Sequence, residues 1–180
     1  VYNVSPFTGR VFTSPRELYF AHLDSIVQLA LTKRIVLQLY PCYLGYGCAA
    51  SEGWCPSVDT TAADSMKWWG QYVGNRYKNF PNILWGIGGD ADPTARKTKL
   101  DSLVAGIKQY STHPITVRDE PETYATTHWA GSTWLDFNGF YTYTITTYTF
   151  AKVARRTAKP AILQESKYEN EQSSTQLDLR

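Results

Sequence analysis

The sequence predicts an α/β fold in which parallel strands are joined by helices. Segments with helical periodicity alternate with short apolar runs, and this order implies parallel strands linked by right-handed crossovers. The runs at residues 83–88 and 161–164 lack a polar alternation, which is typical of strands that are covered on both faces. With 180 residues, 43% of them hydrophobic and 19% charged, the chain can form a globular core. We expect one domain over residues 1–180.

The first predicted helix begins at Ser14, which can cap it, with Pro15 in the first helical position and Glu17 completing a capping box. The helix continues to about Thr32. Its apolar positions recur at helical spacing: Phe20, Leu23, Val27 and Ala30. A strand at residues 35–40 follows. The loop after it, residues 42–60, is long enough to suggest a functional role.

A second helix is predicted at residues 62–77, with a buried face formed by Met66, Trp69, Val73 and Tyr77. The second strand, residues 83–88, ends in Gly88-Gly89-Asp90. A third helix begins at Asp92-Pro93-Thr94. Its apolar residues also recur at helical spacing: Leu100, Leu103, Val104, Ile107 and Tyr110.

The second half of the chain is less regular. A third strand is predicted at residues 114–117, and residues 118–133 show no period. Residues 134–138 are a candidate fourth strand, and whether it continues into the Tyr- and Thr-rich segment that follows stays open. A helix at about residues 148–156 precedes the fifth strand, residues 161–165.

Two architectures fit this order, a doubly wound sheet and part of a (β/α)8 barrel. A doubly wound nucleotide-binding sheet should carry a glycine-rich turn that leads straight into a helix, without an acid at its tip. Residues 86–90 end in an aspartate and match that pattern poorly. The phosphate-binding Gly-x-x-x-x-Gly-Lys pattern is absent from the sequence.

Charge and cysteine content exclude several classes of function. The net charge is +2, with 18 Lys and Arg against 16 Asp and Glu, so there is no electrostatic case for binding nucleic acid or an anionic membrane. No apolar run reaches the length of a membrane span. Cys48 and Cys55 could pair in an oxidising compartment, which would leave Cys42 as a buried thiol. No Cys-x-x-Cys or His-x-x-x-His spacing indicates a metal site, and we expect no cofactor.

Two carboxylates follow predicted strands directly. Asp90 follows the second strand and Glu165 ends the fifth, and chemistry in β/α proteins gathers at the carboxyl ends of strands. We expect the two to face each other across a sugar-binding cleft. The structural alternatives are a helix cap or a loop acid for Asp90, and a salt bridge with Lys159 or Lys167 for Glu165. Three further acids are weaker candidates: Asp92, Glu120 and Glu169.

Five stretches of the sequence resemble the apiosidase-like (β/α)8 glycosidases, the glycoside hydrolase family 140-like group that includes enzymes cutting apiose-linked pectic side chains. The most specific of them contains Arg76-Tyr77, Pro81-Asn82-Ile83 and Gly88-Gly89-Asp90. The five stretches are residues 19–27, 74–90, 134–138, 159–160 and 165–169. The resemblance covers nearly the whole chain, although the loops match less well.

The resemblance implies a TIM (β/α)8 barrel of the glycosidase type, with Asp90 as acid/base and Glu165 as nucleophile. The five predicted strands would be strands three to seven, with strands one and two expected before Val1 and strand eight after Arg180. The chain departs from the family in two places. Residues 118–121 replace a His-Pro element, and residues 140–143 stand where Gln and His are frequent.

The expected function is therefore that of a retaining glycoside hydrolase that cleaves O-glycosidic bonds of plant-type or other complex polysaccharides, among them apiose-linked side chains. Candidate substrate-binding residues are Trp54, Trp129, Asn138, Tyr141 and Tyr168, for each of which packing or turn formation is an open alternative. We expect an oligo- or polysaccharide partner and a secreted, periplasmic or cell-surface location. Three alternatives stay open: a non-catalytic carbohydrate-binding protein, an inactive truncated product, and a metal-dependent hydrolase using Asp90, Asp92 and His128.

Overall fold

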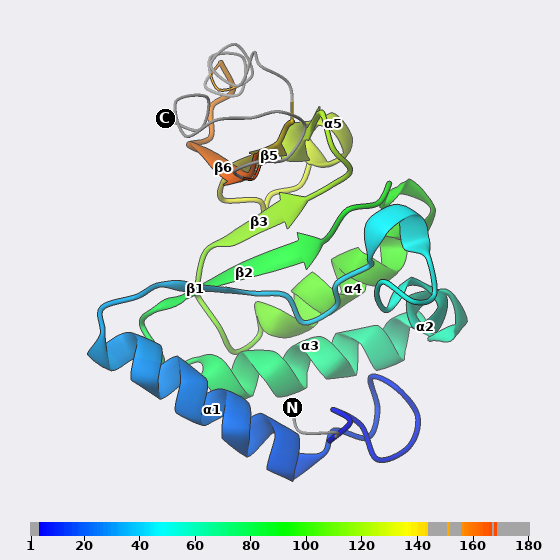
Figure 1. The fold of residues 1–180 in the computed structure, drawn as a ribbon. Coiled ribbons are helices and arrows are strands. Elements are labelled where there is room, and N and C mark those ends of the chain that lie inside the picture. Colours follow the sequence, from blue (N-terminus) through cyan, green and yellow to red (C-terminus); the bar gives the residue numbers. More distant parts are fainter. Residues whose placement is uncertain (1–3, 144–150, 152–155, 167, 169–180) are drawn as a thin grey trace.

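The computed structural model describes residues 4–143, 151, 156–166 and 168 (Figure 1). Strands and helices alternate in the first two thirds of the described chain, as the periodicity predicts. The helices are α1 (Glu17–Thr32), α2 (Cys55–Thr60), α3 (Ala63–Tyr77), α4 (Lys97–Ile107) and α5 (Ala125–Trp129), with short 3-10 turns η1 (Tyr46–Cys48) and η2 (Thr94–Arg96).

The parallel strands follow one another in chain order. Strands β1 (Leu37–Leu39), β2 (Ile83–Gly88) and β3 (Ile115–Arg118) form one parallel sheet in that order. Strands β5 (Asn138–Tyr141) and β6 (Ala161–Glu165) pair in parallel in a second sheet, in which β4 (Thr123–Tyr124) is antiparallel to β5. A parallel bridge between Thr116 and Phe137 joins the two sheets. The carboxyl ends of β2, β3 and β6 consequently lie on the same side of the molecule.

Helices α3 and α4 pack against each other very closely, because small residues form their contact. A Cβ atom added at Gly70 would lie 2.0 Å from the carbonyl oxygen of Leu103, and one at Gly106 would lie 2.0 Å from that of Lys67. Figure 1 shows α1, α3 and α4 on the same side of the first sheet. The apolar face of β2 and these helices form the core, and all six residues of β2 are buried.

The start of α1 differs from the prediction. The helix begins at Glu17, and no side chain caps it, so the predicted capping box is wrong. The reason is a turn upstream of the helix. The backbone oxygen of Ser14 accepts a hydrogen bond from the amide of Thr8 at 2.9 Å, and Pro15 forms an antiparallel bridge with Phe7. These contacts commit Ser14 and Pro15 to the turn rather than to the helix.

The fourth predicted strand is also wrong in position. Strand β5 begins at Asn138, where the prediction ended, and continues to Tyr141. The apolar run before it packs into the core instead of pairing: Leu135 is buried, and Trp134 contacts the Trp129 ring. The structure also places β4 and α5 in residues 118–133, where no element was expected.

The observed boundaries of several other elements lie close to the predicted ones. Strand β2 and helix α3 match their predictions to within one residue, as does β6. Tyr110 lies beyond the end of α4 and is exposed, so it does not belong to the buried helix face. The predicted loop at residues 42–60 contains η1 and α2. Most of the helix predicted at residues 148–156 lies outside the described residues, and residue 151, which is described, is helical.

Candidate active site

Asp90 follows β2 in a backbone conformation that L-residues rarely adopt. Its φ is 52°, and the φ angles of the two residues before it, Gly88 and Gly89, are 82° and 120°. A Cβ atom at Gly89 would lie 2.3 Å from the ring of Tyr43. The two glycines therefore let the chain turn sharply after β2 and pass against Tyr43, and this turn directs the Asp90 carboxylate inward.

Arg118, the last residue of β3, joins the two predicted catalytic residues. Its Nη2 atom donates to Oδ1 of Asp90 at 2.7 Å and forms a short contact with Oε2 of Glu165, the last residue of β6. All three side chains are largely buried, with 11–15% of their surface exposed. Because both oxygens bond one nitrogen, they lie within about 6 Å of each other, twice an ordinary hydrogen-bond length. The predicted proximity of Asp90 and Glu165 is confirmed.

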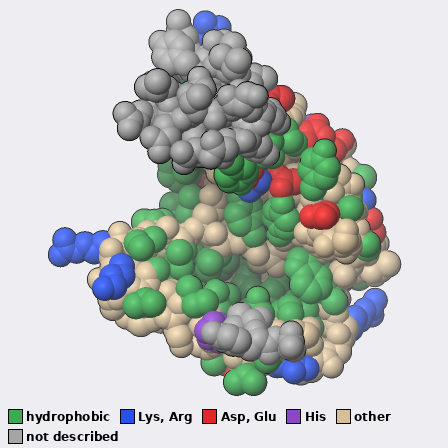
Figure 2. Space-filling view, viewed as in Figure 1, with side chains coloured by type: hydrophobic (Ala, Val, Ile, Leu, Met, Phe, Trp, Pro, Cys, Tyr) green, Lys and Arg blue, Asp and Glu red, His purple; other side chains and the backbone are tan. Residues whose placement is uncertain are grey.

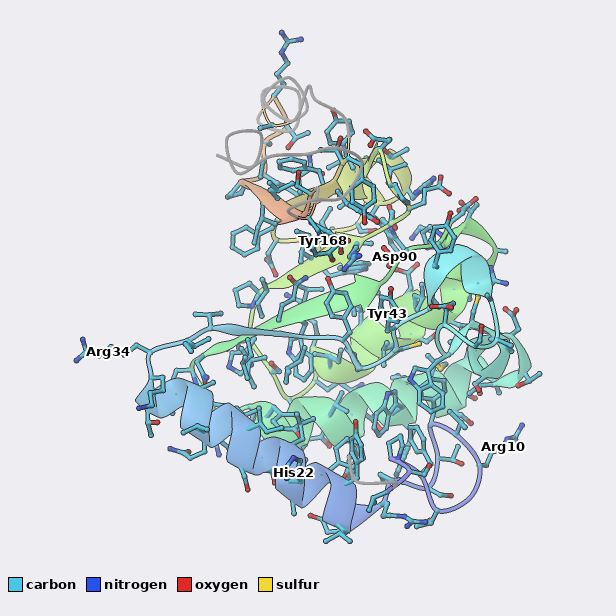
Figure 3. All side chains as sticks on the ribbon, in the orientation of Figure 1. Arg10, His22, Arg34, Tyr43, Asp90 and Tyr168 are labelled. Atoms are coloured by element: carbon cyan, nitrogen blue, oxygen red, sulfur yellow. A yellow bond between two sulfur atoms is a disulfide. The ribbon has the colours of Figure 1, made fainter. Side chains whose placement is uncertain are left out.

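Tyrosine hydroxyls bond the other carboxylate oxygens. The Tyr43 hydroxyl donates to Oδ2 of Asp90 in a short hydrogen bond. The hydroxyls of Tyr143 and Tyr168 donate to Oε1 of Glu165 at 2.7 and 2.9 Å. Figure 3 shows Tyr43, Asp90 and Tyr168 near one another in the middle of the view, with His22 and Arg10 far from them.

These tyrosines stay neutral at physiological pH. Burial, together with the hydrogen bond to Asp90, raises the pKa of Tyr43 well above its ordinary value. Burial and the contacts with Tyr141 and Glu165 do the same for the pKa of Tyr143. For Tyr40, burial raises the pKa to about 12. The hydroxyls of Tyr43 and Tyr143 can therefore act as hydrogen-bond donors to the carboxylates over the whole physiological range.

Two of the five predicted substrate-binding residues lie in this cluster. Tyr141 donates from its hydroxyl to that of Tyr143 at 2.9 Å, and its ring lies 4.7 Å from the guanidinium carbon of Arg118. Tyr168 is 56% exposed while it bonds Glu165. It is therefore the residue of this pair that presents a substantial ring surface to solvent.

Two other predicted binding residues are buried instead. Trp129 has no exposed surface and directs its indole Nε1 toward Asp119. The prediction that its ring stacks on a sugar is therefore wrong for this structure. Asn138 is fully buried, and its side-chain oxygen accepts from the amide of Thr126 at 3.0 Å, which anchors α5. The aromatic and amide residue types alone could not distinguish packing from binding.

Trp54 packs with aromatic residues from the start of the chain. Its ring packs edge-on against Phe7 and Phe12. It lines a cavity of about 260 Å³ with Tyr40, Trp69 and other residues, and this cavity contains neither Asp90 nor Glu165. Figure 2 shows the face hollowed between the helices and the part that carries α5, with acidic side chains gathered on the α5 side.

Two of the structural alternatives, a helix cap by Asp90 and an ion pair between Glu165 and Lys159, are not observed. Asp92, rather than Asp90, bonds the amide of Thr94 at the start of η2. Among the described residues, Lys159 donates to the backbone oxygen of Leu135, and the ion pair of Glu165 is with Arg118. Lys167 and Glu169 lie outside the described residues. Sequence reasoning missed the partners of the pair, although residues 118–121 and 140–143 stood out as departures from the family.

A second buried acid lies beside the cluster. Asp119 is 3% exposed, and burial raises its pKa to about 6. His128 Nδ1 lies 3.0 Å from its Oδ2. In the part of the chain that the structure describes, no three His, Cys, Asp or Glu side chains are grouped to hold a metal ion. No described helix is both long and apolar enough to span a membrane.

Cys48 and Cys55 form a disulfide, and Cys42 is a buried free thiol, as the sequence suggested. The disulfide closes residues 48–55, which follow Tyr43 in the same loop. The amide of Leu44 donates to Gly88, that of Gly47 to Asp90, and that of Trp54 to Tyr43. Backbone hydrogen bonds thus join the loop both internally and to the turn after β2.

Two solved structures with a similar fold are described as glycoside hydrolases. A glycoside hydrolase family 5 protein from Bacteroides vulgatus matches with a TM-score of 0.71 and 23% identity, over 84% of this chain and 35% of that one. A second, described as a glycoside hydrolase, matches with a TM-score of 0.70 and 25% identity, over 84% of this chain and 37% of that one. The chain thus spans about a third of their length. No curated protein matches it.

Fold and family relationships together define a domain of the glycoside hydrolase type. The model of the Apiosidase-like catalytic domain matches residues 1–179, and the chain belongs to that family. The resemblance inferred from residues 74–90 and the other stretches is confirmed.

Proposed function

We propose that the chain carries the catalytic pair of a retaining glycoside hydrolase. The observation that supports this most directly is the meeting of Asp90 and Glu165 at one nitrogen of Arg118. Retaining enzymes hold their two carboxyl groups about 5–5.5 Å apart, whereas inverting enzymes separate them by about 6.5–9.5 Å to admit a water. Two carboxylates that share one nitrogen fit the shorter separation.

The proposed chemistry divides the work between the two acids. Glu165 attacks the anomeric carbon while Asp90 protonates the departing glycosidic oxygen, which gives a glycosyl-enzyme ester and a free alcohol. Asp90 then takes a proton from a water molecule that hydrolyses the ester. The hydroxyls of Tyr143 and Tyr168 orient Glu165 for the attack.

Family membership is the basis for the proposed substrate class, the O-glycosidic bonds of plant-type or other complex polysaccharides, with apiose-linked pectic side chains as the first to test. Among the predicted binding residues, Tyr168 and Tyr141 lie beside the acids and are proposed to contact sugar. Trp54 is proposed only for a more distant subsite, because the structure places it in the aromatic group near Phe7.

We further propose that the five parallel strands are strands three to seven of a (β/α)8 barrel, within a single domain. Their parallel order and the one-third coverage of the solved relatives support this arrangement. The disulfide between Cys48 and Cys55 supports a secreted, periplasmic or cell-surface location, because disulfides persist in oxidising compartments.

The experiment compares Asp90→Asn and Glu165→Gln with the unmodified protein on pectic oligosaccharides that carry apiose-linked side chains. Release of reducing sugar should fall about a thousandfold or more in both variants, because each loses a group that acts on the reacting atoms. Binding, measured by calorimetry, should change little. Glu52→Gln, at an exposed loop position, is the control and should keep full activity.

Undiminished hydrolysis in either acid variant would contradict the assignment. Sugar binding without hydrolysis in the unmodified protein would favour the non-catalytic carbohydrate-binding alternative. Neither binding nor hydrolysis, in a chain that unfolds without cooperativity, would favour an inactive fragment.

A further inference from the structure

Every carboxylate oxygen of the candidate pair already has a donor. Oδ1 of Asp90 accepts a hydrogen bond from Arg118, and Oδ2 accepts one from Tyr43. Oε2 of Glu165 accepts a hydrogen bond from Arg118, and Oε1 accepts one each from Tyr143 and Tyr168. A nucleophile needs an oxygen that can approach carbon, and a general acid needs one that carries a proton toward the leaving group. Each of these oxygens keeps a further lone pair, but Nη2 of Arg118 bonds Oδ1 of Asp90 and Oε2 of Glu165 together and lies where the reacting atoms of a sugar would have to enter.

Arg118 is the donor that the two carboxylates share within the described residues. Tyr43 bonds Asp90, whereas Tyr143 and Tyr168 bond Glu165. The Nη2 atom of a guanidinium carries two hydrogens, so one nitrogen can serve both acids at once. Displacement of this one side chain would free an oxygen on each carboxylate, and no single tyrosine could do the same.

Apart from these carboxylate contacts, Arg118 interacts with two tyrosines, Tyr40 and Tyr141. Its Nε atom is buried and has no hydrogen-bond partner in the part of the chain that is described. Its guanidinium carbon lies 4.7 Å from the ring of Tyr141, a distance that suits a cation–π contact. A ring face permits sliding more readily than a directed hydrogen bond does, so the directional restraints on the guanidinium are the two carboxylates and the hydroxyl of Tyr40.

We propose that Arg118 is a positioning residue that latches Asp90 and Glu165 together in the resting site and is displaced when a sugar enters between them. While latched, it offsets the repulsion between two close anions and keeps them at the separation that retention requires. A catalytic role for this contact rests on the proposed function. The contact of Arg118 with both carboxylates, which we call the latch, exists in the protein without sugar.

A sugar-free experiment tests the latch. The intact protein is treated with a water-soluble carbodiimide and glycine ethyl ester, and amide formation at each carboxyl group is followed by peptide mass spectrometry. In the unmodified protein Asp90 and Glu165 should react far more slowly than the exposed Glu52. Arg118→Met should raise the rates at both acids by about tenfold or more, because each loses a charge-assisted hydrogen bond.

Three variants isolate the shared contact. Arg118→Lys should restore slow reaction at both acids, because an ammonium group can also donate to two carboxylates. Tyr43→Phe should raise the rate at Asp90 alone. Arg76→Met is the matched control: Arg76 bridges Glu17 and Asp24 at a distant surface, and its loss should leave the rates at Asp90 and Glu165 unchanged.

An unchanged rate at either acid in Arg118→Met would overturn the proposal, as would a rise at both acids in Tyr43→Phe. Far-UV circular dichroism of each variant establishes that it is folded, and Arg118→Gln replaces Arg118→Met if the latter is not. Because no sugar is present, this result is independent of hydrolysis by Asp90→Asn and Glu165→Gln. The latch and the glycosidase assignment can therefore fail separately.

Discussion

Gly89 is the residue on which the position of Tyr43 over Asp90 depends. Its φ of 120° lies in a region open almost only to glycine, and an added Cβ would meet the Tyr43 ring at 2.3 Å. The backbone conformation and the packing against Tyr43 thus both require glycine at position 89. The sequence pattern Gly-Gly-Asp indicated a close approach, and the structure identifies Tyr43 as the group approached.

Replacing Gly89 by alanine should destabilise the protein and displace Tyr43. We expect the free energy of unfolding to fall by about 1–3 kcal/mol, the usual cost of forcing a non-glycine residue into such a conformation. Urea denaturation measures the change. Gly131→Ala is the control, because no atom lies within 4 Å of a Cβ added there. Equal stability of the two variants would contradict the prediction.

Asp119 should make the stability of the protein depend on pH. Burial raises its folded-state pKa to about 6 from an ordinary value of 3.8. Between these values the folded chain keeps a proton that the unfolded chain releases, so stability falls as pH rises from about 4 to about 6 and the cost persists above that range. The groups that face Asp119 are His128, Trp129 and the like charge of Asp92.

The measurement compares urea denaturation of the unmodified protein and Asp119→Asn across pH 4 to 7. The stability of the unmodified protein relative to the variant should fall by roughly 2–3 kcal/mol over this range. Asp64→Asn, at an exposed position, corrects for the loss of one surface charge. A relative stability that rises with pH would show that the contact with His128 outweighs burial.

At the scale of elements, the segment between β1 and α3 is built to hold Tyr43. The disulfide joins η1 to α2, and backbone hydrogen bonds tie the segment to Gly88 and Asp90. The sequence allowed the Cys48–Cys55 pair but could not show its role. That role depends on Leu44 and Gly47 bonding a turn that lies about forty residues later in the chain.

Removing the disulfide should cost about 2–3 kcal/mol of stability, the loop-closure value for a loop this short. We expect Cys48→Ser/Cys55→Ser to unfold at lower urea concentration than the unmodified protein. Under reducing conditions the two should unfold at similar concentrations. A variant as stable as the oxidised protein would contradict the prediction.

Elements were predictable where one physical signal dominated. Strand β2 was found because both faces are buried, which produces an uninterrupted apolar run. The start of α1 and the position of β5 were missed because local signals compete with contacts elsewhere. Ser14 is taken by a turn with Thr8, and Trp134 and Leu135 are apolar because they pack in the core.

At the scale of the whole molecule, parallel topology accounts for the site. Asp90 and Glu165 are far apart in sequence, yet the carboxyl ends of parallel strands meet on one side, so their proximity could be predicted from strand positions alone. The shared contact with Arg118 could not, because a side chain at the end of β3 can bond either neighbour or solvent. The same limit applies to Trp129 and Asn138, whose burial depends on the placement of α5.

Asp90 and Glu165 are proposed to act as a retaining pair. Proton NMR of the anomeric signal during the first turnovers of hydrolysis tests this proposal most directly, on whichever apiose-linked pectic oligosaccharide the protein cleaves. If Asp90 and Glu165 form a retaining pair, the first sugar released should have the anomeric configuration of the bond that was cut and equilibrate only later. Initial release of the opposite anomer would contradict it.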